Sequence, residues 1–276
     1  MLANERSIAF IGGGNMARSL IGGLVAAGTD AARIRVAEPV DTLRAGLADD
    51  FGVTVCTEAA DAVEDAGTWV FAVKPQVMRT VCEALASHAR EDRPLAISIA
   101  AGITTTQIAR WLGTDPGIVR CMPNTPALLG AGVTGLFASR AVDAAGRSSA
   151  EALLHTAGTT VWIDDESLMD AVTAVSGSGP AYGFLLAEAM QAAGEAEGLA
   201  PDVARTLAAQ TLLGAARMLI EPGAEPAAEL RRRVTSPGGT TQAAIETFEA
   251  GGFRDLVARA IHAARLRGAE LSAAND

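Results

Sequence analysis

Aromatic residues, lysine and cysteine are scarce in this chain of 276 residues. Aromatic side chains make up 4% of the sequence, and Lys74 is its sole lysine. No apolar run reaches the about 20 residues that a membrane-spanning helix needs, and the first residues lack the apolar segment of a signal peptide. Cys56, Cys82 and Cys121 form neither a CxxC pair nor a metal-ligand spacing, which favours reduced thiols. We therefore expect a cytoplasmic protein with no membrane contact and no metal site.

Positive charge is also in short supply. The net charge of −10 argues against a nucleic-acid-binding surface, because the phosphate backbone attracts basic proteins. The cluster Arg231–Arg233 is too short to change this and is typical of a solvated helix face. His88, His155 and His262 lie in no motif, and no Ser-His-Asp or Cys-His arrangement can be assembled from the sequence. We therefore expect no nucleic-acid partner and no chemistry centred on a histidine base.

The N-terminus contains a dinucleotide-binding pattern. An apolar run at 8–11 leads directly into Gly12-Gly13-Gly14-Asn15-Met16-Ala17, which is the G-x-G-x-x-G/A fingerprint after a strand and at the start of a helix. Gly12 permits the tight turn, and Gly14 lets the backbone approach a pyrophosphate. A second strand at 34–37 ends at Glu38, where an acid that binds the ribose is expected. Strand, turn, helix, strand and acid in this order predict dinucleotide binding.

Further apolar runs indicate an α/β fold. The runs at 69–73, 95–99 and 117–121 are typical of buried parallel strands, and the loops after them should line the cofactor cleft. Two more strands are expected at 133–138 and 160–163, and the chain beyond Asp164 carries almost no strand signal. The sequence predicts a Rossmann-type dinucleotide-binding domain over 1–164 and an all-α domain over 165–276. The predicted helices of the second domain cover 166–175, 180–197, 201–220, 226–234, 240–250 and 253–272.

The second domain contains the polar loop Ser236-Pro237-Gly238-Gly239-Thr240-Thr241, which precedes an amphipathic helix. Such a loop can turn several backbone N–H groups toward one point, and a helix start favours negative charge there. The threonine hydroxyls add donors that stay neutral at any working pH. We interpret the loop as a pocket for a small carboxylate with Thr241 beside the chemistry. An ordinary capped helix start is the alternative.

The sequence does not decide the roles of its only lysine and its only tyrosine. Lys74 follows a buried strand, where it is suited either to contact the nicotinamide ribose or the substrate, or to form a strand-end salt bridge. Tyr182, the sole tyrosine, follows Ser176-Gly177-Ser178-Gly179-Pro180-Ala181, in which Pro180 suits the first turn of a helix. It is either a proton donor or a partly buried residue at a helix start.

Five motifs together resemble one family. They occur in the order Gly12–Ala17, Ala72–Pro75, Met122–Pro126, Ser176–Tyr182 and Ser236–Thr241. The chain resembles pyrroline-5-carboxylate reductase from Ile8 to about Leu271. This resemblance implies that the cyclic imine 1-pyrroline-5-carboxylate is reduced to L-proline by NADPH or NADH. It also implies a homodimer formed through interleaved C-terminal helices, often assembled further into decamers.

The resemblance and the fingerprint also imply site residues. The cofactor would be held by Ile11, Gly12, Gly13, Gly14, Asn15, Met16, Glu38, Ala72, Val73, Lys74, Pro75, Ile99, Ala100 and Ala101. The substrate carboxylate would be held by Ser236, Gly238, Gly239, Thr240 and Thr241. Thr241 is the catalytic candidate, because it would hydrogen-bond the ring nitrogen. For the reduction of an imine by the nicotinamide, a neutral hydroxyl suffices to orient the nitrogen and relay a proton from water, whereas oxidation of an alcohol usually needs a general base.

Two positions depart from the family pattern. Glu38 stands where the family often has a small polar residue or a nearby arginine, and a carboxylate there suits NADH and repels the 2′-phosphate of NADPH, unless Arg44 offsets it. Arg231-Arg232 stands where a lysine-aspartate pair is expected. Other hypotheses remain, namely a reductase of another cyclic imine or a hydroxy acid on the same scaffold, and a non-catalytic dinucleotide sensor.

Overall fold

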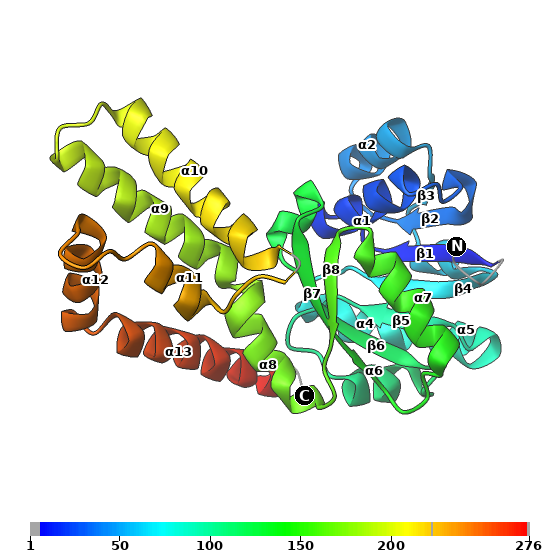
Figure 1. Cartoon of the computed structure of the whole chain (residues 1–276). Coiled ribbons are helices and arrows are strands. Elements are labelled where there is room, and N and C mark those ends of the chain that lie inside the picture. The colour runs from blue at the N-terminus through cyan, green and yellow to red at the C-terminus, as the bar shows by residue number, and fades with distance from the viewer. Residues whose placement is uncertain (1–5, 222, 275–276) are drawn as a thin grey trace. The chain divides into compact units, whose positions relative to one another are not determined.

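The structure, a computed structural model, describes residues 6–221 and 223–274 and divides into two compact units (Figure 1). The first unit extends to Ser178 and also includes the chain from Ala264 onward, and the second unit covers Gly179–Ala263. The predicted boundary at 164 followed the change from strands to helices. The division by compactness falls later, because the residues just after 164 pack with the sheet.

The first unit is built on an eight-stranded sheet with the order β3-β2-β1-β4-β5-β6-β7-β8. Neighbouring strands are parallel except for the antiparallel pair β6 and β7. The strands are β1 Ser7–Ile11, β2 Ile34–Ala37, β3 Thr54–Cys56, β4 Ala66–Phe71, β5 Leu95–Ser98, β6 Ile118–Met122, β7 Gly132–Ala138 and β8 Gly158–Trp162. The chain runs outward from β1 to β3 and returns to β4 on the other side of β1. The topological switch point, where open α/β sheets bind ligands, therefore lies between β1 and β4.

Helices cover both faces of this sheet, which is the doubly wound α/β arrangement. On one face, Leu20 and Leu24 of α1 pack into the cluster that contains Phe10 and Val70. On the other face, Met78 of α4 packs into the cluster that contains Trp69 and Phe71. The helices of this unit are α1 Asn15–Ala26, α2 Asp41–Phe51, α3 Ala59–Val63, α4 Pro75–Ala84, α5 Ala86–Asp92, α6 Thr105–Leu112 and α7 Ala144–His155. The predicted α/β fold is confirmed.

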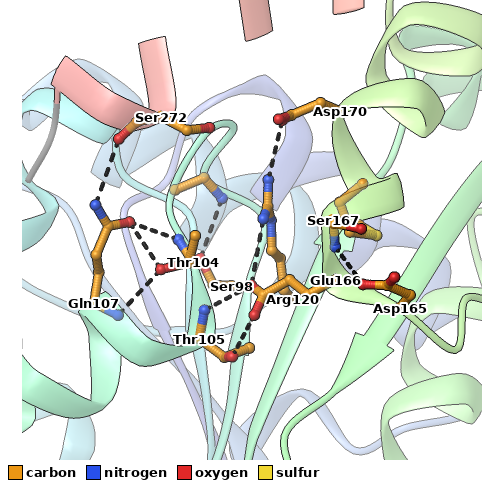
Figure 2. A network of polar contacts seen from close by, with 12 residues as sticks. Ser98, Thr104, Thr105, Gln107, Arg120, Asp165, Glu166, Ser167, Asp170 and Ser272 are labelled. Carbon is orange, nitrogen blue, oxygen red and sulfur yellow. Dashed lines mark hydrogen bonds and ion pairs between the residues drawn. The ribbon is translucent and has the colours of Figure 1, made fainter. Parts of the chain in front are cut away.

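The chain after β8 forms a broken helix on the sheet instead of the continuous helix predicted over 166–175. It consists of the 3₁₀ turn η3 Glu166–Leu168, α8 Met169–Val172 and a π-helix η4 Thr173–Gly177. Val172 packs against β7 so closely that a Cβ added at Gly135 would lie 2.5 Å from its Cγ1. Figure 2 shows Arg120 of β6 directed at Glu166 and Asp170, with Nη–O distances of 3.3 and 3.5 Å.

The second unit is entirely helical within the residues described. Its elements are α9 Gly179–Ala196, α10 Pro201–Ile220, α11 Ala227–Arg233, α12 Thr240–Ala250 and the first part of α13 Phe253–Ala274. The α9–α10 turn is tight, since a Cβ added at Gly194 would lie 3.3 Å from Leu199 and 3.4 Å from Ala204. Each of these helices was predicted to within two residues. None of the helices described has the length and apolar character needed to cross a membrane.

Candidate active site

The glycine turn after β1 is held between the ends of two neighbouring strands. Gly12 has a φ of +101°, and a Cβ there would lie 2.6 Å from the carbonyl oxygen of Ala72, so the turn requires glycine. The N–H of Gly12 donates to the carbonyl of Ala37 at 2.8 Å, and the N–H of Ala72 donates to the carbonyl of Ile11 at 2.8 Å. The turn therefore lies at the switch point and is fixed from β2 and from β4.

Helix α1 begins without a side-chain cap. Gly14 is its N-cap residue in an extended conformation, and no side chain bonds the first N–H groups of the helix. A Cβ added at Gly14 would meet no atom within 4 Å, so the space before the helix start is open. Asn15 is exposed and Met16 is partly buried. Free N–H groups, a favourable helix dipole and open space together fit a pyrophosphate.

Glu38 is tied to this turn through its carboxylate. The residue is only 6% exposed. Its Oε2 accepts the N–H of Gly13 at 2.8 Å, and its Oε1 accepts the N–H of Val40 at 2.9 Å. Arg44 donates to the backbone carbonyl of Glu38 at 2.7 Å and pairs with Asp41. The carboxylate thus stabilises the glycine turn through its bond to the N–H of Gly13. The guanidinium of Arg44 bonds the backbone carbonyl of Glu38 and forms no ion pair with its carboxylate.

The loops after β4 and β5 supply the other predicted cofactor residues at the same edge of the sheet. Lys74 is the exposed N-cap residue of α4, and Pro75 is the first residue of that helix. Within the described part of the chain, no carboxylate lies within ion-pair distance of Lys74, so the predicted salt-bridge alternative has no partner there. Ala100 is buried and donates its N–H to Ser98 Oγ at 3.3 Å. Val73, Ile99 and Ala101 lie beside these residues in the chain.

The predicted carboxylate pocket lies in the second unit, at the start of α12. Gly238 has a φ of +71°, and the N–H of Gly239 donates to the carbonyl of Ser236 at 3.0 Å, which closes the turn. Gly239 is the N-cap residue and, like Gly14 in α1, provides no side-chain cap. Thr240 and Thr241 are exposed in the first turn of α12. An uncapped helix start beside two hydroxyls is suited to a small anion.

Sequence reasoning missed one participant in this loop. Gln242 accepts the N–H of Gly238 through Oε1 at 2.7 Å, and its Nε2 donates to Glu246 at 2.7 Å. One donor assigned to the substrate is therefore occupied by a side chain of the first helical turn. A glutamine four residues after an αL glycine, at a helix start with no other cap, was the signal available in the sequence.

The arginines before this loop are paired locally. Arg231 contacts Glu249 at 3.4 Å, Arg233 contacts Glu225 at 2.9 Å, and Arg232 pairs with Glu229. A hydrogen bond from Arg254 lowers the pKa of Glu249. Arg231 thus takes part in an ion pair despite the departure from the family pattern. In the residues that the structure describes, no group of three His, Cys, Asp or Glu side chains is placed to hold a metal.

Two regions of the chain match known protein families, and together they show the class of enzyme. Residues 7–102 match the family described as "NADP oxidoreductase coenzyme F420-dependent", and residues 166–271 match the family described as "Pyrroline-5-carboxylate reductase dimerisation". The fold, the glycine turn and these matches define a dinucleotide-dependent oxidoreductase with a helical dimerisation domain.

Similarity over the whole chain identifies the family within that class. Pyrroline-5-carboxylate reductase of Pseudomonas aeruginosa is 54% identical over 265 residues, which is 96% of each chain. A reductase structure from Coxiella burnetii has a TM-score of 0.93 at 43% identity and covers 97% of this chain and 99% of that one. The Plasmodium falciparum enzyme with NADP bound has a TM-score of 0.85 at 25% identity, with 97% and 98% covered. The chain belongs to the pyrroline-5-carboxylate reductase family.

Proposed function

We propose that this protein reduces 1-pyrroline-5-carboxylate to L-proline with NADPH or NADH as the hydride donor. The observation that carries the proposal is the uncapped start of α1 behind the glycine turn, in a chain that is 54% identical to a pyrroline-5-carboxylate reductase over 96% of its length. A reduced nicotinamide supplies the hydride for this reaction. The residues of the chain must bind the cofactor and the substrate, align the imine carbon with the nicotinamide, and supply a proton to the ring nitrogen.

The cofactor residues are assigned by their places around the switch point. Ile11 to Met16 surround the open space before α1, where the Cβ of any residue other than glycine at position 12 would collide with Ala72. Ala72 to Pro75 and Ile99 to Ala101 follow the next two strands and complete this edge of the sheet. Lys74, which has no carboxylate partner in the described chain, is assigned to the nicotinamide side of the cleft.

The substrate carboxylate is assigned to the start of α12. Ser236, Gly238, Gly239, Thr240 and Thr241 present backbone N–H groups and hydroxyls there, and Gln242 gives up the N–H of Gly238 when the substrate binds. Thr241 donates or accepts at the ring nitrogen and relays its proton from water. No strong acid is required, because a protonated C=N already accepts a hydride. Alignment of this kind contributes about 7–11 kcal/mol in favourable cases.

The second unit supports an oligomer. Residues 166–271 match a dimerisation family, and α9 has no buried residue in the single chain although it contains Phe184, Leu185 and Leu186. We infer a homodimer formed through the C-terminal helices, with assembly of dimers into a decamer as the larger form. Three free cysteines, Cys56, Cys82 and Cys121, support a cytoplasmic location.

The substrate is tested by steady-state turnover of three compounds with each cofactor. The proposal expects saturable oxidation of NADPH or NADH with pyrroline-5-carboxylate. A six-membered cyclic imine acid and a β-hydroxy acid should react at least about 10-fold less efficiently, because a misplaced reacting atom loses the benefit of alignment. Equal or better turnover of either analogue would overturn the substrate assignment. Binding of cofactor without turnover of any compound would identify a dinucleotide sensor.

The same assay tests Glu38 as the residue that sets the cofactor preference. A carboxylate at this position repels a 2′-phosphate, so the kcat/KM of NADPH should exceed that of NADH by less than about 100-fold. Glu38→Gln removes the charge and retains one acceptor oxygen, which can serve the N–H of Gly13, while the bond to Val40 is lost. It should shift the preference toward NADPH by about 10-fold. Glu91→Gln, on the exposed surface of α5, is the matched control and should leave the ratio unchanged. A ratio that does not move in Glu38→Gln would contradict this role.

A further inference from the structure

The π-helix Thr173–Gly177 immediately precedes the second unit. It is closed by the N–H of Ser178, which donates to the carbonyl of Thr173 at 2.8 Å. π-Helices are rare and occur mostly as single turns, frequently at functional sites. The division between the two units falls one residue later, at Gly179. The chain therefore enters the predicted substrate-binding unit directly from this turn.

One carbonyl at the end of this turn, that of Ser176, lacks the N–H partner that a regular α-helix would supply. In an α-helix the carbonyl of Ser176 would accept the N–H of residue 180, but Pro180 has none. Asn124 fills this place, because its Nδ2 donates to the carbonyl of Ser176 at 3.1 Å. Ser176 in turn donates its Oγ to the carbonyl of Val172 at 2.9 Å. The π-turn is thus completed by two side chains, one of them from the loop after β6.

Both polar atoms of the Asn124 side chain have partners within the protein. The residue is 9% exposed, and its Oδ1 accepts the N–H of Val133 at 3.0 Å. The side chain therefore links its own loop, which follows β6 at the cofactor edge of the sheet, to β7 and to the π-turn. This arrangement makes Asn124 a structural link between the three segments.

Two further side chains on β6 hold the same segment at alternate positions. Arg120 is 5% exposed and pairs with Glu166 and Asp170 (Figure 2). Met122 lies so close to the π-turn that a Cβ added at Gly177 would be 2.5 Å from its Cε. Side chains two residues apart share one face of a strand. Arg120, Met122 and Asn124 therefore contact the segment from its start to its end.

We propose that Asn124 is a positioning residue of the reductase: it fixes the last turn before the second unit to the loop at the cofactor edge of the sheet. This inference rests on the proposed function. Hydride transfer needs the imine to be held close to the cofactor, and the chain that bears the substrate loop starts from this turn. Loss of the link loosens the start of α9 and weakens productive substrate binding, while the cofactor residues around Gly12 remain in place.

The test uses two substitutions with graded effects on the full-length protein. Asn124→Asp keeps the size and the acceptor for Val133, but it removes the donor to Ser176. Asn124→Ala removes both bonds. Asp143→Ala is the matched control, because it deletes the N-cap bond of Asp143 to the N–H of Gly146 in α7 and leaves the π-turn intact. Gly135→Ala reaches the π-turn by a second route, since the added methyl group pushes Val172 away from β7.

Three measurements distinguish positioning from a general loss of stability. Hydrogen exchange of peptides covering 169–182 should accelerate in both Asn124 variants and in Gly135→Ala, but not in Asp143→Ala. The kcat/KM for pyrroline-5-carboxylate should fall about 10-fold with the loss of one orienting hydrogen bond. The Kd of NADH, followed by nicotinamide fluorescence, should stay within about twofold, because no cofactor residue is changed.

Each outcome decides part of the inference. Unchanged exchange of 169–182 in the Asn124 variants would refute the link itself. Faster exchange with unchanged imine kinetics would refute its role in catalysis, as would a parallel loss in Asp143→Ala. If the wild-type protein turns over no pyrroline-5-carboxylate, the proposed function and the catalytic role of Asn124 both fail. The exchange data would still decide whether Asn124 holds the π-turn.

Discussion

The two units differ in where their apolar side chains lie. In the first unit Trp69, Phe10 and Phe71 are fully buried between the sheet and its helices. In the second unit the only buried residues among those described are Ala204 and Ala208. Phe184 of α9 is 69% exposed, and α9 as a whole has no buried residue. The first unit closes its own core, whereas the second leaves its apolar surface open.

This difference shows what each unit needs in order to be complete. A helix that is apolar on all sides belongs inside a bundle, and a large exposed apolar patch on a soluble protein marks an interaction site. A cyclic dimer can supply the missing helices, because it places the same patch of both subunits face to face. Dinucleotide binding should thus be a property of the first unit, and the second unit should depend on assembly.

The largest effect is expected from a charge placed in the open apolar surface. Phe184→Glu should raise the dimer Kd at least about 100-fold, because it puts an unpaired charge on the exposed apolar surface of α9, through which we propose that the dimer forms. Turnover should fall with the dimer fraction, while NADH binding to the first unit remains. Light scattering at several protein concentrations measures the dissociation.

Leu129→Glu is the matched control in the first unit. Leu129 is 87% exposed, more than Phe184, but it belongs to a short 3₁₀ turn and not to an apolar helix. The dimer Kd should not change. Equal dissociation by both substitutions, or by neither, would remove the distinction between the units.

The next largest effects are expected at the glycine turn. Gly12 is needed for the backbone conformation, whereas we expect Gly14 to be needed to leave space for the pyrophosphate. Gly12→Ala should lower both Tm and NADH affinity by a measurable step, at least about 10-fold in Kd, because φ is positive and the methyl group meets Ala72. Gly14→Ala should leave Tm unchanged, since no protein atom lies within 4 Å, and still weaken NADH binding. Unchanged binding in Gly14→Ala would mean that the pyrophosphate does not approach this residue.

A smaller effect is expected in the second unit from Thr241→Ala. Loss of one orienting hydrogen bond of about 1.5 kcal/mol should lower kcat/KM about 10-fold or more. Thr241→Ser keeps the hydroxyl and should restore most of the activity. Thr247→Ala, farther along α12, is the control and should be near wild type. If Thr241→Ala retains full activity, Thr241 takes no part in the mechanism.

The smallest expected effect is on the pH dependence of the unfolding free energy, and it comes from the thiols of the first unit. Burial raises the pKa of Cys82 from 9.0 to about 12, and burial also raises the pKa of Cys56 and of Cys121. The native state therefore keeps protons that the unfolded chain loses, so the contribution is complete below about pH 9 and declines as the pH rises toward 12.

Urea unfolding at several alkaline pH values measures this decline. Cys82→Ala should flatten the fall in unfolding free energy above pH 9. Cys56→Ala, at a partly exposed position, should change it less. An identical slope in the wild type and in Cys82→Ala would contradict the raised pKa.

Long apolar runs made most of the sheet predictable from the sequence. The missed strand, Thr54–Cys56, is a three-residue edge strand with an exposed first residue, and it lacks both the length and the continuous apolar pattern of a buried strand. The predicted helix over 166–175 was wrong in its continuity. Its π-turn is hydrogen-bonded to Asn124, which is far away in the sequence, and local periodicity contains no information about such a contact.

The sequence motifs predicted which residues belong to the candidate site, but not which hydrogen bonds these residues form. The fingerprint predicted the glycine turn and an acid at Glu38, but the bond from Gly13 to that carboxylate depends on how β1 and β2 align. In the second unit, Gln242 was a visible signal as a glutamine in the first turn of the helix, but its bond to the N–H of Gly238 depends on the left-handed conformation of that glycine. The role of Thr241 remains a prediction that the substitutions above address, and the role of Lys74 remains a prediction.

Isotope transfer tests the central claim most directly. The protein is mixed with NADH that carries deuterium on the transferable position of the nicotinamide, together with pyrroline-5-carboxylate, and the product is analysed by mass spectrometry and chiral chromatography. The account predicts L-proline with a single deuterium on the former imine carbon. Proline without deuterium, or cofactor binding with no proline formed, would contradict it.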